Sequence, residues 1–273
     1  MSVIIGDAII AGNRRNLLPE ASLTPKTGVT YTSGLSGIEP ATLTLLSQAI
    51  SNNADITSAT NTVYVDYETT HVKIDVGDQV TLSLNGADYA FNVIGFNHDT
   101  LADPGAYGAT TKTGKAGITF QMHDLFATTY QMNSSNTNSG GWKSSAMRTS
   151  TMATMKEYMP AAWQTAIKPV NKVSGTGGGS SSGTEAVSDN CFLLAEIEIF
   201  GSANYSVSGE GTQYAYYKAG NSKVKNKGSS AYAWWERSPR SGDSNFFCYV
   251  FTHGNTSYNS ATNRCGVAFG FCV

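Results

Sequence analysis

The sequence predicts an α+β fold, a class in which antiparallel strands and helices occupy separate parts of the chain. Three observations lead to this class. Short segments rich in Val, Ile, Phe and Tyr recur along most of the 273 residues. Few segments have the spacing of amphipathic helices, and long Gly-, Ser- and Asn-rich stretches separate the elements. We expect many short strands, two helices and long loops, together with a small N-terminal module.

Residues 1–70 differ from the rest, and we expect them to form an attachment or oligomerisation module. Pro40–Asn52 has the spacing of a short amphipathic helix, with Pro40 suited to its first turn. Thr62–Asp66 alternates like a strand. The alternative, in which this region merely packs on the main domain, fits the sequence equally well.

The main domain, residues 71–273, begins with strand patterns. Val80–Leu84 and Tyr89–Phe96 flank Asn85-Gly86, a pair typical of type I′ turns, so we expect a hairpin with a slightly longer loop. Gly117–Leu125 is expected to be another strand. The last strands are expected at Ala233–Arg237, Phe247–Phe251 and Val267–Val273.

Helices are expected in the middle of the chain. Ser144 or Ser145 can cap a helix that continues through Met155 to a point before Pro160, and its Met-rich face suits a core. A second helix, Ala161–Lys168, is expected to stop at Pro169, and Gly177–Gly183 reads as a flexible loop.

Cys191–Phe200 reads as a buried strand in which Glu196 and Glu198 face the same way. Two acids on one strand could serve a glycosidase. We instead expect one of them to pair with Arg148 or Arg237, because a buried charge needs a partner.

Composition excludes several classes of function. The net charge is −2 and only 14% of residues are charged, with no basic stripe, so we expect no nucleic-acid partner. No apolar run approaches the ~20 residues that span a bilayer, so we expect no membrane insertion. The first ten residues are apolar but lack a basic start and contain Asp7, so we expect cytoplasmic synthesis without a signal peptide.

The sequence has no pattern typical of catalysis or of metal binding. No nucleophile elbow, dinucleotide fingerprint or zinc-site spacing is present, so we expect no enzyme, no cofactor and no metal. Cys191 reads as a buried thiol. Cys248 could pair with Cys265 or Cys272 in an oxidising setting, although a reducing cytoplasm opposes this.

The C-terminal segment has the composition of a recognition surface. Two aromatic blocks, Tyr232–Pro239 and Gly266–Val273, enclose Ser241–Cys265, where 13 of 25 residues are Ser, Thr, Asn or Tyr. Antibody paratopes use the same types, Tyr for rigid contact area and Ser and Asn for adaptable hydrogen bonds. This framed segment predicts a binding protein.

The same segment lacks five residue types. From Ser238 to Val273 there is no Lys, Gln, Glu, Met or Trp, the five types that codons ending in C or T cannot encode. A gene segment diversified at the adenines of AAC or AAT codons would show this exclusion. Chance in an Asn- and Ser-rich loop is the alternative.

Four segments in order carry a resemblance to a known family. They are Trp142-x-Ser-Ser-x-x-Arg148, Phe192-Leu-Leu-x-Glu196-x-Glu-Ile-Phe200, Trp234-Trp-Glu-Arg-Ser-Pro239 and Gly266-Val-Ala-Phe-Gly-Phe. From about Val72 to Val273 the chain resembles gut-bacterial and phage proteins with a C-type-lectin-like fold, several of which are variable proteins of diversity-generating retroelements. Members often have Gly-Val-Arg-Pro where this chain has Gly266-Val-Ala-Phe.

The resemblance implies a receptor-binding protein of a phage or prophage tail, with its variable segment at about 240–265. Trp234, Trp235, Arg237 and Pro239 would then be scaffold, and exposed residues of the segment would bind ligand. It also implies a virion or bacterial cell surface, a host surface protein or glycan as ligand, other virion proteins as partners of residues 1–70, and a homo-oligomer, with a trimer as one candidate. The expected contact residues are Arg240, Asp243, Asn245, Tyr249, Phe251, His253, Asn255, Tyr258, Asn259, Asn263 and Arg264.

Two other functions remain open. An invariant structural protein of a virion or cell surface would have the same fold. The formylglycine-generating enzymes share the lectin-like architecture and use reactive cysteines near the C-terminal end, which makes Cys265 and Cys272 the remote alternative for catalysis.

Overall fold

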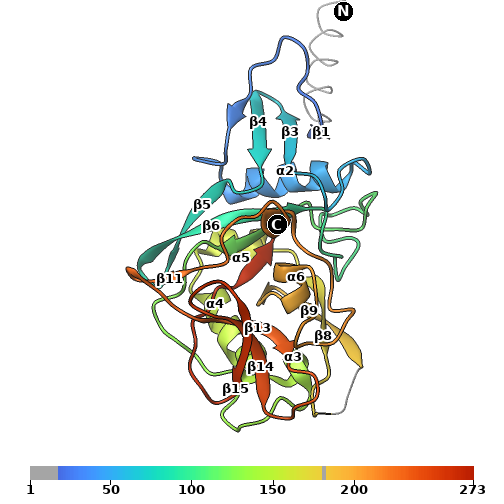
Figure 1. The fold of residues 1–273 in the computed structure, drawn as a ribbon. Helices are drawn as coiled ribbons and strands as arrows, with labels where there is room; N and C mark the ends of the chain where they lie inside the picture. The colour runs from blue at the N-terminus through green and yellow to red at the C-terminus, as the bar shows by residue number, and fades with distance from the viewer. Residues whose placement is uncertain (1–17, 180–182) are drawn as a thin grey trace, which may run out of the picture.

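The computed structural model describes residues 18–179 and 183–273 and has an α+β architecture. The expectation for the first ten residues lies outside the described residues, as does part of the Gly177–Gly183 loop. In Figure 1 an N-terminal sheet lies at the top, a five-stranded sheet crosses the middle and a three-stranded sheet lies at the bottom. In the described part of the chain, no helix is long and apolar enough to cross a membrane.

The N-terminal sheet has the strand order β1-β3-β4-β2. The expected boundary at residue 70 falls inside the β3–β4 hairpin, so the sheet of this region extends to Asp75. Helix α2, Pro40–Ser51, begins at Pro40 and buries Leu43, Leu46 and Ile50 as expected. The strands of this sheet are β1 (Glu20–Ser22), β2 (Thr32–Ser33), β3 (Thr62–Tyr67) and β4 (Thr70–Asp75).

Helix α2 also packs on the main domain. The hydroxyl of Ser47 accepts a hydrogen bond from the backbone N–H of Ile118, at 3.0 Å, and donates to the carbonyl of Val273. A Cβ on Gly117 would clash with the carbonyl oxygen of Ser47, so this contact requires glycine. The N-terminal region and the main domain therefore share a tight backbone contact.

The central sheet is antiparallel with the order β10-β16-β7-β6-β5. Asn85 and Gly86 have φ values of 50° and 81°, so they form a two-residue turn of the I′ kind, shorter than expected. In β5 buried and exposed residues alternate, as period-two patterning requires. Its strands are β5 (Gln79–Leu84), β6 (Ala87–Phe96), β7 (Ile118–Met122), β10 (Cys191–Phe192) and β16 (Gly270–Cys272).

Of the two helices expected in the main domain, the first is divided, the second is continuous and ends at Ala166, and three further short helices occur among the described residues. Ser145 Oγ accepts a hydrogen bond from the backbone N–H of Arg148, as expected of a capping serine. Met147 and Met155 are fully buried. The helical segments are α3 (Gly141–Ser144), the π-helical turn η1 (Met147–Thr151), α4 (Met152–Glu157), α5 (Ala161–Ala166), α6 (Glu196–Phe200) and α7 (Ala215–Lys218).

The prediction of a strand over Cys191–Phe200 was wrong after Phe192. Residues 196–200 form helix α6, because the Glu198 carboxylate accepts a hydrogen bond from the backbone N–H of Ala195, at 2.9 Å, and Gly201 ends the helix at φ 76°. Glu196 and Glu198 therefore point to different partners.

The C-terminal sheet has the order β13-β14-β15, all antiparallel. Strands β13 (Trp234–Pro239) and β14 (Phe246–Val250) lie where the sequence predicted strands, whereas β15 (Thr256–Ser260) was not expected. Two small hairpins complete the fold, β8 (Val170–Gly175) with β9 (Thr184–Asp189) and β11 (Asn226–Lys227) with β12 (Ser230–Ala231).

Candidate functional site

Strand β13 is the buried support of the C-terminal segment. Trp234, Trp235 and Arg237 are 0% exposed and Pro239 is buried, as expected of scaffold residues. The indole N–H groups of the two tryptophans donate to backbone carbonyls, that of Trp235 to Tyr130 at 2.8 Å. Because burial and these hydrogen bonds fix β13, they also fix the position of the neighbouring strand β14.

Arg237 belongs to a buried group of four charges. Its NH1 and NH2 atoms lie 2.5 and 2.9 Å from the two carboxylate oxygens of Glu198. Lys172 Nζ lies 2.8 Å from Glu198 and 2.6 Å from Asp99. The Tyr214 hydroxyl donates to Asp99, at 2.9 Å. We call Asp99, Lys172, Glu198 and Arg237 the buried charge network.

The two cations of this network keep its acids ionised. Burial alone would raise the pKa of Asp99, yet Lys172 and His98 hold it well below its usual range. Burial likewise opposes ionisation of Glu198, and Arg237 with Lys172 lowers its pKa. The network joins β8, α6 and β13, so it locks together segments that are far apart in the sequence.

A second buried acid in β13 has no such partner. Neither carboxylate oxygen of Glu236 has a hydrogen-bond partner among the described residues. Burial raises its pKa well above the ordinary value, and the nearby Glu196 and Glu210 add to the rise. Burial and the neighbouring acids therefore favour the neutral form of Glu236.

The expected contact residues lie on two faces of the C-terminal sheet. Cys248 pairs with Tyr258, and Tyr249 with Ser257. Because successive side chains of a strand point to opposite faces, Tyr258 and Tyr249 lie on opposite sides. The segment therefore presents two surfaces and not one continuous patch.

On the first face an arginine stacks on a tyrosine. The Arg240 guanidinium carbon lies 3.8 Å from the ring centre of Tyr258, and Arg240 also pairs with Asp243. The rings of Tyr205 and Phe246 lie 5.0 and 5.4 Å from that of Tyr258. We call these five residues the Tyr258 cluster.

The second face contains Tyr249, Phe251 and His253, which we call the Phe251 face. Phe251 is 41% exposed, and its ring lies 5.6 Å from that of His253. Tyr249 is only 9% exposed, because it packs against Trp235 on one side and Phe251 on the other. The expectation that Tyr249 is an exposed contact residue is therefore corrected.

The remaining expected residues lie at the ends of these strands. Asn255 is exposed, and its carbonyl closes the turn between β14 and β15. Asn263 Nδ2 donates to Asn259 Oδ1, at 2.5 Å. Arg264 is exposed and its NH2 group donates to the carbonyl of Thr129. Asn245 is half-buried, and its carbonyl accepts from Ala261.

One supporting residue of the segment was not found from the sequence. Asn138 is 0% exposed, and its side-chain N–H group donates to the carbonyls of Asp243 and Phe246, each at 2.8 Å. Its Oδ1 accepts from the backbone N–H of Gly178. The turn-forming sequence Asn138-Ser-Gly-Gly141 was the available signal.

The four cysteines are free, buried thiols, so Cys248 pairs with neither Cys265 nor Cys272. Burial raises the pKa of Cys191 to about 12 and that of Cys265 to about 11. Within residues 18–179 and 183–273, no group of three or more His, Cys, Asp and Glu side chains could hold a metal ion.

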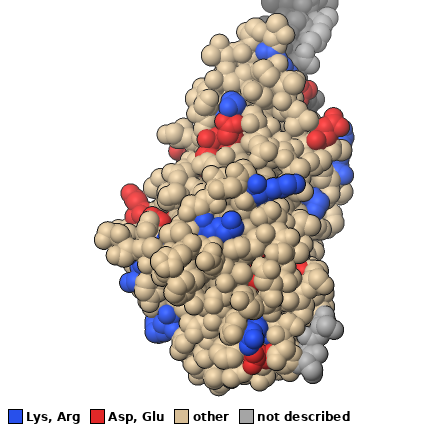
Figure 2. Space-filling model, in the orientation of Figure 1, with Lys and Arg blue, Asp and Glu red and all other residues tan. Residues whose placement is uncertain are grey.

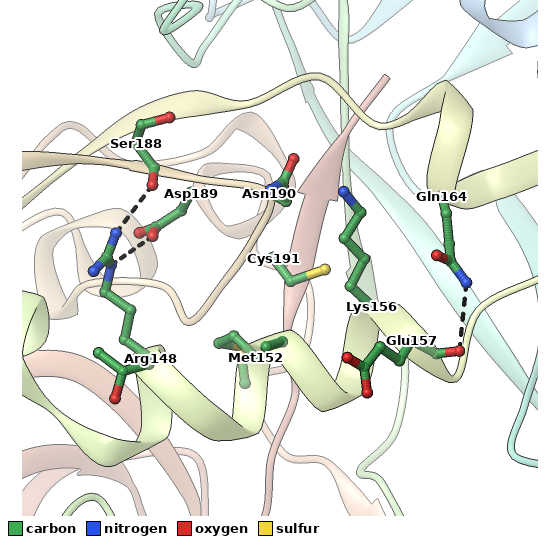
Figure 3. Close-up of a pocket in the computed structure, with 11 residues that line it drawn as sticks. Arg148, Met152, Lys156, Glu157, Gln164, Ser188, Asp189, Asn190 and Cys191 are labelled. Carbon is green, nitrogen blue, oxygen red and sulfur yellow. Dashed lines mark hydrogen bonds and ion pairs between the residues drawn. The ribbon is translucent and has the colours of Figure 1, made fainter. Parts of the chain in front are cut away.

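The surface is mostly uncharged on the face drawn in Figure 2, where Lys, Arg, Asp and Glu are scattered. A pocket with a volume of about 580 Å³ lies between α4 and the junction of β9 with β10, apart from the C-terminal sheet (Figure 3). None of the expected contact residues lines it.

These features define an α+β protein in which a buried charge network supports a C-terminal sheet with polar and aromatic side chains on both faces. The chain belongs to the DUF6273 family, described as a domain of unknown function, whose model matches residues 116–273. The match contains the whole network except Asp99, together with the C-terminal sheet. Neither the curated proteins nor the solved structures gave a significant match.

Proposed function

We propose that this protein is a non-enzymatic ligand-binding protein, of the kind found on phage or prophage tails, whose segment 240–265 is diversified by a retroelement. The single observation that carries the proposal is the contrast in burial between β13 and the edge strand β15. Strand β13 is buried throughout, whereas all five residues of β15 are half-buried and lie at the edge of the sheet.

This contrast suits a segment that changes its sequence. Loops and edges on a rigid scaffold carry recognition in many binding proteins, because the scaffold keeps its shape while they vary. Tyr258 stacked with Arg240 supplies aromatic and cationic groups of the types that dominate interface energies. The Phe251 face supplies a second exposed aromatic group.

We propose a C-type-lectin-like topology for residues 71–273. The proposal is supported by the four sequence segments of the resemblance, all of which fall in buried or structured parts of the chain. Trp142, Glu198 and Arg237 each come from one of these segments, and each makes buried polar contacts. A shared scaffold would require these contacts.

The proposed ligand is a surface protein or glycan of a host cell, and the proposed place of action is a virion or bacterial cell surface. The N-terminal sheet and α2 would then attach the protein to other virion proteins or assemble a homo-oligomer. Copies held together would compensate for weak single contacts by avidity.

Two alternatives differ in what they require. An invariant structural surface protein would keep residues 240–265 constant. A formylglycine-generating type of enzyme would need a thiol of lowered pKa, whereas burial raises the pKa of Cys265 to about 11 and that of Cys272 well above its usual value. The buried thiols therefore do not suit this type of enzyme.

Deep sequencing of the 3′ end of the gene from a growing population tests the proposal. We expect substitutions at codons of exposed positions such as Phe251, His253 and Asn263. The buried positions Phe247 and Val250, within the same segment, serve as internal controls and should stay constant. A segment as constant as the rest of the gene would contradict diversification and favour the structural alternative.

A further inference from the structure

A cavity of the described chain lies apart from the C-terminal segment. It holds about 580 Å³, within the usual range for small-molecule pockets, and its residues come from η1, α4, α5 and the β9–β10 junction (Figure 3). Its chemistry is independent of whether residues 240–265 vary.

One wall of this cavity is fixed by a complete ion pair. Arg148 Nε lies 2.6 Å from Asp189 Oδ1, and Arg148 NH2 donates to the carbonyl of Ser188. Asp189 also accepts a hydrogen bond from the indole N–H of Trp142, at 2.7 Å. These two charges satisfy each other, so they leave no net charge for a ligand.

Of the two cations that line this cavity, Arg148 is paired and Lys156 is not paired with any described residue. Lys156 lines the cavity and is half-buried, and its ammonium group forms no ion pair or hydrogen bond with any residue in 18–179 or 183–273. In Figure 3 its side chain extends across the cavity between Asn190 and Gln164. A lysine held in a hollow without a counter-ion attracts an anionic group.

The groups around Lys156 restrict that anion. Glu157 lines the same cavity, and its carboxylate would repel a doubly charged phosphate more than a singly charged carboxylate. Gln164 Nε2 donates to the carbonyl of Met159, at 2.8 Å, so its side-chain oxygen can accept from a hydroxyl. Asn190 is exposed at the rim and offers a further amide.

Apolar atoms complete the cavity. Met152 and Cys191 are each 3% exposed and line its wall, where they can contact the carbon skeleton of a ligand. One cation, several hydroxyl-binding groups and an apolar wall match a compact molecule with one carboxylate and several hydroxyls. We propose that this cavity binds a sugar acid, with its carboxylate on Lys156 and its hydroxyls on Glu157, Gln164 and Asn190.

Calorimetric titration of the full chain tests this site, with glucuronate as the probe and glucose as the uncharged control ligand. We expect glucuronate to bind at least about tenfold more tightly than glucose, and to bind less tightly as salt is added. Equal affinity for the two sugars, or tighter binding of inorganic phosphate, would overturn the proposal.

Two variants separate the charge from the shape of the site. Lys156→Gln should weaken glucuronate binding at least about tenfold, whereas Lys218→Gln, at an exposed lysine of α7 outside this cavity, should leave it unchanged. Ala153→Phe places a ring in the cavity from an exposed position and should abolish binding while Lys156 remains. Unchanged affinity in Lys156→Gln contradicts the assignment.

A disaccharide with glucuronate at its non-reducing end distinguishes the two sources of such a ligand. Tighter binding of the disaccharide than of free glucuronate would indicate a glycan terminus, and weaker binding would indicate a free sugar acid. If Lys156→Gln weakens binding of both the disaccharide and free glucuronate, both ligands bind at the Lys156 cavity.

Discussion

The guanidinium of Arg237 contacts both carboxylate oxygens of Glu198, with N···O distances of 2.5 and 2.9 Å, and both side chains are buried. A bidentate pair of this kind fixes orientation as well as distance. It joins α6 to β13, the strand that pairs with β14 of the segment that we propose binds ligand. Lys172 connects this pair to Asp99, so the buried charge network depends on all four charges.

Lys172→Met should therefore destabilise the protein strongly. The change leaves Asp99 and part of Glu198 buried without their cation, and loss of one partner of a buried pair costs about 3–5 kcal/mol. Urea unfolding would measure the loss. Lys143→Met removes the exposed ion pair with Glu185 and should cost less than about 1 kcal/mol. Equal losses in the two variants would contradict a central role for the network.

Glu236 should make stability fall as pH rises. Because burial raises its folded-state pKa, its stabilising contribution is complete below the unfolded value of about 4.3 and is lost above it. Glu236→Gln removes this pH-dependent loss. Above about pH 4.3 the free energy of unfolding of the variant should therefore rise relative to the wild type by up to about 1.4 kcal/mol per pH unit. Unfolding at several pH values would measure the gain. Glu39→Gln, at an exposed acid, serves as the matched control for removal of a carboxylate.

Gly117→Ala should loosen the contact between α2 and the central sheet. The new methyl group would clash with the carbonyl of Ser47, and overpacking of this kind costs about 1–3 kcal/mol. Hydrogen exchange of α2 amides should rise together with the loss of stability. Gly105→Ala, in an exposed loop, should be nearly neutral. Unchanged exchange in α2 would show that the helix can move away without cost.

Tyr249→Ala and Tyr258→Ala should differ in stability. Tyr249 is 9% exposed and packs on Trp235, so its loss leaves a cavity worth about 2–4 kcal/mol. Tyr258 is half-buried and stacks mainly with Arg240, an interaction worth about 0.5–1 kcal/mol at exposed sites. Thermal unfolding of both variants would rank them. The reverse order would mean that the Tyr258 cluster is structural.

The thiols should resist alkylation in the folded protein. Burial raises the pKa of Cys265 to about 11 and that of Cys191 to about 12, so both remain protonated at pH 8. We expect iodoacetamide to modify the four cysteines only after unfolding, as mass spectrometry would detect. One thiol that reacts rapidly at neutral pH would support the enzymatic alternative.

The sequence predicted best where the signal is local. Asn85-Gly86 determined the hairpin of β5 and β6, and Pro40 marked the first turn of α2. The prediction of a strand beyond Phe192 was wrong. Ile197 and Ile199 alternate with acidic residues, and this alternation resembles the two-residue repeat of a strand. Glu198 and Gly201 were the capping signals that outweighed this alternation.

The candidate site could be predicted only in part. Its scaffold residues were identified from their types, and the pairing of Arg237 with Glu198 was among the expected pairings. The division of the contact residues between two faces depends on strand β15, whose Ser, Asn and Thr residues resemble a loop. Lys172 and Asp99 come from distant segments, so no local pattern indicated them.

The position of β16 in the central sheet has a consequence for synthesis of the chain. Strand β16 lies between β7 and β10, both of which are translated much earlier. Until β16 leaves the ribosome, both strands have an unpaired edge, and unpaired edges promote aggregation. Residues 240–265 emerge just before this strand, so the segment that we propose binds ligand is synthesised before the sheet closes.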